Sequence, residues 1–264
     1  MIPSRADNLP MKIRPLLLAA AMLCVSGVAR AQSSPENFGF EGGLIFWKPS
    51  PEIVLTSGTL GTPVDFINTF AVEDKRFRSY RIVTKAGKHK IRFSKEDIKY
   101  DATATLPVTI RFQGQTYTVG VPTTAELDWH LTRIGYEWDP ISTPRGFVGL
   151  VFDLKYSNIN AQLSAPGVTT EIFEHKIPVP TVGGIARGYL GQYISVTAEL
   201  TGFKVNRSDF EAKFFDFDLY GTANLGRNLG VQYGYRSVTV KYDIDEDAGD
   251  LKLKGPYFGL LVRF

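Results

Sequence analysis

The sequence predicts an all-β fold, an antiparallel transmembrane β-barrel of about ten strands, with eight or twelve strands as the alternatives. Three observations predict it. Apolar and polar residues alternate with a period of two along most of the chain, which places successive side chains on opposite faces of a strand. Tight connections alternate with long ones. Charged residues keep to one face of many strands, whereas a helical period is nearly absent.

Residues 1–31 are expected to form a signal peptide. Lys12 and Arg14 make its basic segment, residues 15–28 are apolar, and Ala29-Arg30-Ala31 supplies the small residues that signal peptidase requires. This pattern predicts export through a cleaved leader.

Two other roles for the leader are disfavoured. Its apolar run is shorter than the roughly 20 residues that cross a bilayer as a helix. Leu23 precedes Cys24, where a lipoprotein signal needs a small residue. We therefore expect cleavage before Gln32 and an outer-membrane barrel over 32–264, with Met11 as an alternative start of the leader.

The charge of the expected mature chain gives no argument for nucleic-acid binding. Four of the 30 basic residues and one of the 27 acidic residues precede Gln32, which leaves 26 of each sign. The single cysteine and all three methionines also precede it. Processing therefore leaves no disulfide, no thiol nucleophile and no thiolate metal ligand, and we expect no cofactor.

Ten strands are expected from the alternation, and their connections are of two kinds. The connections after the second, fourth, sixth and eighth strands are tight and the others are long, as in outer-membrane barrels with short periplasmic turns and long extracellular loops. Such strands span the bilayer with roughly 9 to 11 tilted residues. The predicted ranges are 38–48, 76–86, 89–103, 124–139, 146–158, 180–190, 193–204, 212–226, 229–242 and 251–264.

The two faces of these strands define an outside and an inside. In the fifth strand, Val148, Leu150, Phe152, Leu154 and Tyr156 share one face, which we assign to lipid. The opposite, polar face then lines the lumen, where charges of both signs can pair across it. The predicted lumenal charge network comprises Arg81, Arg92, Arg133, Glu137, Asp153, Lys155, Arg187, Glu199, Asp216, Asp218 and Arg236.

Aromatic residues near strand ends suit interfacial girdles, and the fourth strand is irregular. In that strand Leu127, Trp129 and Leu131 alternate out of phase with the apolar residues that follow them. A bulge near Thr132, or exit of the strand from the membrane there, would reconcile the two phases. The expected girdle residues are Trp47, Tyr136, Trp138, Tyr193, Tyr233 and Phe258.

The last strand carries an assembly signal. Phe258, Leu260, Val262 and Phe264 share one face, and the segment resembles the terminal strand of bacterial outer-membrane barrel proteins, which end in phenylalanine after alternating apolar residues. The whole chain looks most like uncharacterised outer-membrane barrel domain proteins. This resemblance implies the barrel assembly machinery, outer-membrane lipid and lipopolysaccharide as partners, and it implies no activity.

Catalysis has one weak candidate, the pair Asp128 and His130 on one face of the fourth strand. A water-facing or headgroup-facing pair at the outer rim is the simpler interpretation. Omptin proteases, lipid A deacylases and outer-membrane phospholipases are small barrels with histidine sites, and the ten strands are similar to the omptins. No local motif of those enzymes occurs here.

Three loops invite other interpretations. Residues 243–250 resemble a calcium loop, but the glycine comes one residue late and Lys254 stands at the glutamate position, so no metal site is expected. Residues 104–123 are expected to continue as a β-hairpin. Residues 159–184, which contain three prolines, are the candidate for a mobile external segment or an inward plug.

Two functions follow from these observations. The first is a non-enzymatic barrel, either a surface structural or binding protein or a narrow channel, since wide aqueous channels need more strands. The alternative is a hydrolase acting on lipid or peptide at the outer rim. The ligand or substrate is not indicated.

Overall fold

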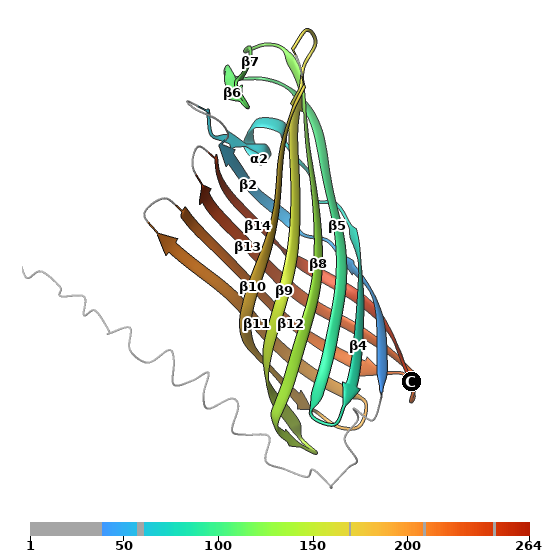
Figure 1. The fold of residues 1–264 in the computed structure, drawn as a ribbon. Helices are drawn as coiled ribbons and strands as arrows, with labels where there is room; N and C mark the ends of the chain where they lie inside the picture. Colours follow the sequence, from blue (N-terminus) through green and yellow to red (C-terminus); the bar gives the residue numbers. More distant parts are fainter. Residues whose placement is uncertain (1–38, 57–60, 169, 208–209, 245–246) are drawn as a thin grey trace, which may run out of the picture. The chain divides into compact units, whose positions relative to one another are not determined.

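The computed structural model describes residues 39–56, 61–168, 170–207, 210–244 and 247–264. The predicted leader lies outside these residues. Ten positions form the wall of a barrel, and β1 and β2 share one of them (Figure 1). The wall strands are β1 (Phe40–Trp47) with β2 (Ser50–Thr56), β4 (Phe77–Ala86), β5 (His89–Thr105), β8 (Pro122–Thr143), β9 (Gly146–Ser164), β10 (Glu171–Tyr189), β11 (Ile194–Arg207), β12 (Phe210–Asn224), β13 (Leu229–Ile244) and β14 (Asp247–Arg263).

Every neighbouring pair in this wall is antiparallel, and the wall closes on itself. β1 pairs with β4 on one side and with β14 on the other, while β2 extends the ladder along β14. Closure matters because a backbone N–H or C=O left unpaired in hydrocarbon costs several kcal/mol. The predicted closed antiparallel barrel of ten strands is confirmed.

The two ends of the barrel differ, and we name them by their connections. The turn end carries the tight turns after β4, β8, β10 and β12, together with the C-terminus (Figure 1). The loop end carries the other connections, except the short one from β1 to β2, which lies partway along the wall. At the loop end lie β3 (Val64–Asp65), α2 (Phe66–Phe70), β6 (Ile110–Phe112) and β7 (Gln115–Tyr117).

The prediction for residues 159–184 is wrong. These residues are not a mobile segment or a plug but the loop-end parts of β9 and β10, which pair in register from Leu163 and Glu171 downward. Prolines and polar outward side chains made the segment look like a loop. Both are compatible with a strand whose outer face meets water and whose edge toward β11 is not paired.

The polarity of the wall inverts partway along each tall strand. On β8, Leu127, Trp129 and Leu131 point inward and are buried, whereas Ile134 and Tyr136 point outward with 58% and 37% of their surface exposed. The ladder with β9 has no register shift between residues 124 and 138, so there is no bulge near Thr132. The strand instead leaves the apolar band there, which is the second of the two expected explanations; the one shift lies between Trp138 and Ile141.

Beyond the inversion, the interior is a hydrophobic core. Phe66 and Phe70 of α2 are buried in it, with α2 capped by Asp65, whose carboxylate accepts hydrogen bonds from two backbone N–H groups. The predicted hairpin within 104–123 is confirmed as β6 and β7. Phe112 and Tyr117 of this hairpin are fully buried, and Tyr117 donates to the Leu163 carbonyl at 2.7 Å. The hairpin therefore packs against the barrel.

Candidate functional site

The eleven predicted lumenal charges all lie on the inward face of the apolar band. Ten of them are buried, and Arg81 is partly buried. They come from β4, β5, β8, β9, β10, β11, β12 and β13, so nearly the whole circumference of the wall contributes. The period-two alternation places them there, because each alternates with an apolar neighbour that faces outward.

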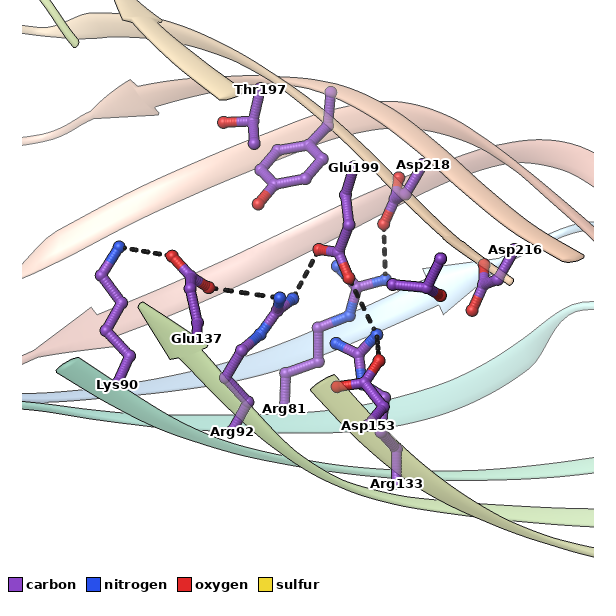
Figure 2. Close-up of polar contacts among 12 residues, drawn as sticks. Arg81, Lys90, Arg92, Arg133, Glu137, Asp153, Thr197, Glu199, Asp216 and Asp218 are labelled. Atoms are coloured by element: carbon purple, nitrogen blue, oxygen red, sulfur yellow. Dashed lines mark hydrogen bonds and ion pairs between the residues drawn. The ribbon is translucent and has the colours of Figure 1, made fainter. Parts of the chain in front are cut away.

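One chain of ion pairs crosses the lumen from β5 and β8 to β11 (Figure 2). Lys90 Nζ lies 2.7 Å from Glu137, and Glu137 lies 3.2 Å from Arg92. Arg92 contacts Glu199 at 2.5 Å, and Glu199 also accepts from Arg133 at 3.0 Å. Glu199 thus holds two guanidinium groups from different strands.

A second chain joins β12 and β13 to β5 and β9. Arg236 forms a two-pronged contact with Asp216, with both N···O distances at 2.9 Å, and reaches Glu96 at 2.5 Å. Lys155 contacts Asp216 at 2.8 Å and lies 4.0 Å from Asp153. Bidentate guanidinium–carboxylate pairs are both stronger and more directional than single contacts.

Four more contacts involve Arg81 and Arg187. Arg81 pairs with Asp218 at 3.0 Å, and the Tyr257 hydroxyl donates to the same carboxylate at 2.8 Å. Arg187 donates to the hydroxyls of Thr197 and Tyr220. Asp216 is therefore a partner of Arg236, and Asp218 is a partner of Arg81.

Trp47 is a correction to the predicted aromatic girdle. It is buried inside the barrel, where its indole N–H donates to the Gly255 carbonyl at 3.1 Å. The guanidinium of Arg236 lies 5.3 Å from its ring centroid, a cation–π contact. The inward phase of β1 places it there, since Ile45 two residues earlier is also buried.

Sequence reasoning missed three members of the network: Lys90, Glu96 and Asp139. Lys90 pairs with Glu137 and with Asp139, and Glu96 pairs with Arg236. Lys90 and Glu96 share the phase of Arg92 on β5, so extending the alternation one step back and two steps forward would have found both. Asp139 lies within the register shift of β8 and keeps the phase of Glu137 two residues earlier, so the same alternation would have found it as well.

With these members the network is electrically balanced. It holds seven cationic and seven anionic side chains, each buried or nearly so, and therefore presents no net charge to a permeating ion. The cations are Arg81, Lys90, Arg92, Arg133, Lys155, Arg187 and Arg236; the anions are Glu96, Glu137, Asp139, Asp153, Glu199, Asp216 and Asp218.

The predicted pair Asp128 and His130 does not form. His130 Nδ1 lies 2.7 Å from Asp97 on β5, and Asp128 contacts Lys99 at 3.4 Å. His130 and Asp97 each expose 49% of their side chain on the outward face beyond the apolar band. Within the described ranges, no serine or threonine hydroxyl is hydrogen-bonded to His130.

The outward face beyond the band is a solvated wall of charged pairs. On β2 and β14, hydrogen bonds from Lys254 and Lys252 lower the pKa of Glu52. In the calcium-like segment, Asp250 pairs with Lys241 and Asp247 lies 3.6 Å from His175. Across the described residues, no three His, Cys, Asp or Glu side chains are grouped so as to hold a metal ion.

The residues of the predicted assembly signal face outward at the turn end. Phe258, Leu260 and Val262 each expose about two fifths of their surface, in register with the outer faces of β1 and β13, and Phe264 is the most exposed of the four. Their position extends the apolar band to the last residue of the chain.

Comparison with known proteins gives the fold but no family. No family profile and no curated protein matches the chain, and no helix in its described part is long and apolar enough to cross a membrane. Among solved structures, the outer membrane protease OmpT from Escherichia coli is 8% identical, with 89% of this chain and 99% of that chain covered and a TM-score of 0.57.

Two further similar structures have lower TM-scores. The translocator domain of the autotransporter NalP from Neisseria meningitidis is 12% identical, covers 95% of this chain and 94% of its own, and has a TM-score of 0.46. The toluene transporter TodX from P. putida is 8% identical, with 86% and 90% covered and a TM-score of 0.40. The fold is that of bacterial outer-membrane β-barrel proteins, a class whose members differ widely in activity.

Proposed function

We propose that the chain is an integral outer-membrane barrel with a structural interior, which acts through its wall and its loop-end surface as a non-enzymatic structural or binding protein. The observation that carries this proposal is the filled lumen. Balanced, mutually paired charges occupy the apolar band, and the hydrophobic core around Phe66, Phe112 and Tyr117 occupies the loop end. A route for water through the barrel would have to cross both.

Physical cost supports the same conclusion. Breaking a buried ion pair by removing one partner costs about 3–5 kcal/mol, so an ion that displaced Glu199 from Arg92 and Arg133 would face a penalty of similar order. Barrels of about eight to ten strands leave an interior that side chains fill, whereas aqueous channels appear near 16 strands. This disfavours the narrow-channel form of the proposal.

The experiment is conductance across planar lipid bilayers. Folded protein, checked by heat-modifiable migration, should insert without unitary conductance steps, whereas a 16-stranded porin handled identically supplies the positive control. Reproducible steps whose frequency rises with the amount of folded protein, and which change when Glu199 is replaced by alanine, would contradict a closed lumen.

A hydrolase of the outer rim is the second candidate, and the hydrogen bond between His130 and Asp97 is the observation that favours it, since such a pair can serve as a general base. Its exposure and the lack of a bonded nucleophile argue against it. Wild-type protein and His130→Ala should both leave a fluorogenic peptide panel and radiolabelled phospholipid unhydrolysed above an empty-membrane control. Turnover lost in His130→Ala would favour the enzyme.

We also propose that the leader is removed before Gln32, because the small residues at 29 and 31 fit signal peptidase. N-terminal sequencing of the membrane-fraction protein should begin at Gln32. A start within 1–31, or recovery in the soluble periplasmic fraction, would contradict this proposal.

A further inference from the structure

The wall of the barrel has a seam between β10 and β11. The two strands pair only over Val182–Tyr189 and Ser195–Gly202, although β10 stays paired with β9 up to Glu171. Residues 171–181 of β10 therefore have no ladder with β11, and Figure 1 shows the two strands diverging toward the loop end. On its other side β11 stays paired with β12 as far as Arg207 and Phe210, so the parting is confined to the side that faces β10.

Two prolines explain why the seam stays open. Pro178 and Pro180 pair with Tyr156 and Leu154 of β9 without a register shift. Since that ladder is intact, the N–H groups that proline lacks belong to the opposite edge, which faces β11. β10 therefore cannot extend its ladder to β11 at these positions, and the seam is a built-in feature of the sequence.

One side chain of β10 crosses the interior in the upper part of the seam. The His175 ring of β10 lies 5.9 Å from the Tyr242 ring of β13, and its Nε2 lies 3.6 Å from Asp247 of β14. The seam between β10 and β11 is itself bounded toward the turn end by the Val182–Gly202 pair.

An apolar groove of about 980 Å³ begins where the β10–β11 pairing ends. Its lining includes Val182, Phe203, Phe214 and Phe215, and it continues across the outer face of β9 to Leu154. This volume is at the upper end of the range for ligand pockets, which are lined mainly by apolar and aromatic side chains. The groove is continuous with the lipid-facing band, so its occupant arrives from the bilayer.

Two lysines stand at the rim of this groove. Lys204 of β11 and Lys213 of β12 are directly opposite each other in the ladder, and both are exposed on the outward face. Neither has an ion-pair or hydrogen-bond partner among the described residues. Like charges directly opposite in a sheet are destabilising, and an anion between them would remove the repulsion. Lys241, opposite Lys213 on β13, is different because it forms an ion pair with Asp250.

We propose that this groove binds an anionic lipid of the surrounding membrane, with an acyl chain against Val182 and Phe215 and the phosphate between Lys204 and Lys213. The charge pair and the groove meet at the level where the outer face changes from apolar to polar, as the boundary between chain and headgroup does in a lipid. The proposal rests on the proposed function, because it requires the barrel to stand in a bilayer.

The test measures which lipid lies in the groove. Phe215→Trp is introduced into a Trp138→Phe background, and the protein is folded into phosphatidylcholine vesicles containing a minor fraction of brominated phosphatidylglycerol or brominated phosphatidylcholine. Bromine quenches the indole only at close range. Two lysines near an anionic headgroup predict a roughly 30-fold preference of the site for the anionic lipid. A reporter at Leu260, on the outward face of β14 and away from the groove, should show no preference.

Charge variants separate a specific site from general attraction. Lys204→Gln with Lys213→Gln should abolish the preference at position 215, whereas the matched pair Lys252→Gln with Lys254→Gln should preserve it. Equal quenching by both lipids, survival of the preference without Lys204 and Lys213, or its loss on adding inorganic phosphate at constant ionic strength would each overturn the lipid site. Failure of the proposed function looks different: neither reporter would be quenched, because the barrel would not be in the bilayer.

Discussion

Replacing Phe152 with arginine should cripple folding of the barrel in lipid vesicles, whereas Asn160→Arg on the same face of the same strand should be tolerated. Phe152 is the middle residue of the outward apolar run from Val148 to Tyr156 on β9. Asn160 lies four outward positions further toward the loop end, where the interior is apolar and the outer face is polar.

The magnitude follows from the dimensions of the strand. From Val148 to Tyr156 the chain rises about 26 Å, which at a strand tilt of about 40° gives about 20 Å along the barrel axis, close to the band of about 25 Å typical of outer-membrane barrels. Asn160 is about 20 Å along the axis from Phe152, beyond the half-height of such a band. An arginine on the lipid face costs about 2–4 kcal/mol at the midplane and about 0–1 kcal/mol near the interface.

The assay is the free energy of unfolding from reversible denaturant titration in vesicles, followed by intrinsic fluorescence and by heat-modifiable migration. Phe152→Arg should lose at least about 2 kcal/mol relative to Asn160→Arg. If the two variants unfold at the same denaturant concentration, Phe152 does not face lipid, and the inside and outside assigned to every strand would have to be exchanged or abandoned.

Four further outcomes are expected. Glu199→Gln should cost about 3–5 kcal/mol of unfolding free energy, because Arg92 and Arg133 lose a buried charged partner. Glu126→Gln, which affects an exposed pair, should cost no more than about 1 kcal/mol. The denaturant midpoints of the two variants distinguish these outcomes. Phe112→Ala should cost about 3–5 kcal/mol by leaving a cavity in the loop-end core, and a midpoint unchanged from wild type would show that the hairpin does not contribute to it. Deleting Phe264 should sharply lower the yield of folded barrel in cells, as read by heat-modifiable migration and surface labelling; an unchanged yield would contradict an assembly signal. Hydrogen bonds from Lys254 and Lys252 lower the pKa of Glu52, so this carboxylate contributes stability that is present above its unfolded pKa and is lost as the pH falls. By NMR, its carboxyl should titrate below its usual value of 4.5. Replacing both lysines with glutamine should return the pKa to that value.

Much of the wall was predictable because side chains along a strand point alternately inward and outward, so one assigned residue fixes the face of every other residue on that strand. Once Phe152 is assigned to lipid, Asp153 must point inward, and the same step places Arg92 and Glu199. All eleven predicted lumenal charges lie inside for this reason. The closed ten-stranded order followed from the same alternation and from the need to pair every backbone group.

Partners across the lumen were not predictable, because they depend on the stagger between strands. Asp218 and Arg236 are opposite in the β12–β13 ladder, yet Arg236 pairs with Asp216 and Asp218 pairs with Arg81. His130 shows the same limit. Asp128, two residues away on its own strand, is about 6.5 Å distant along the backbone, whereas a residue directly opposite on the next strand is about 5 Å away, and Asp97 occupies that position.

The phase inversion explains why the loop end was the hardest part to interpret. Where a barrel wall stands in lipid, its outer face is apolar and its inner face is polar. Where the wall stands in water, its outer face is polar, so Leu127 and Trp129 point into an apolar interior while Asp128 points outward. A rule that assigns apolar residues to lipid fails at this boundary and suggests a bulge or a loop. The same boundary is where β10 parts from β11 and where Lys204 and Lys213 stand, so the site proposed for lipid lies at the one level of the wall where both chain and headgroup find a matching surface.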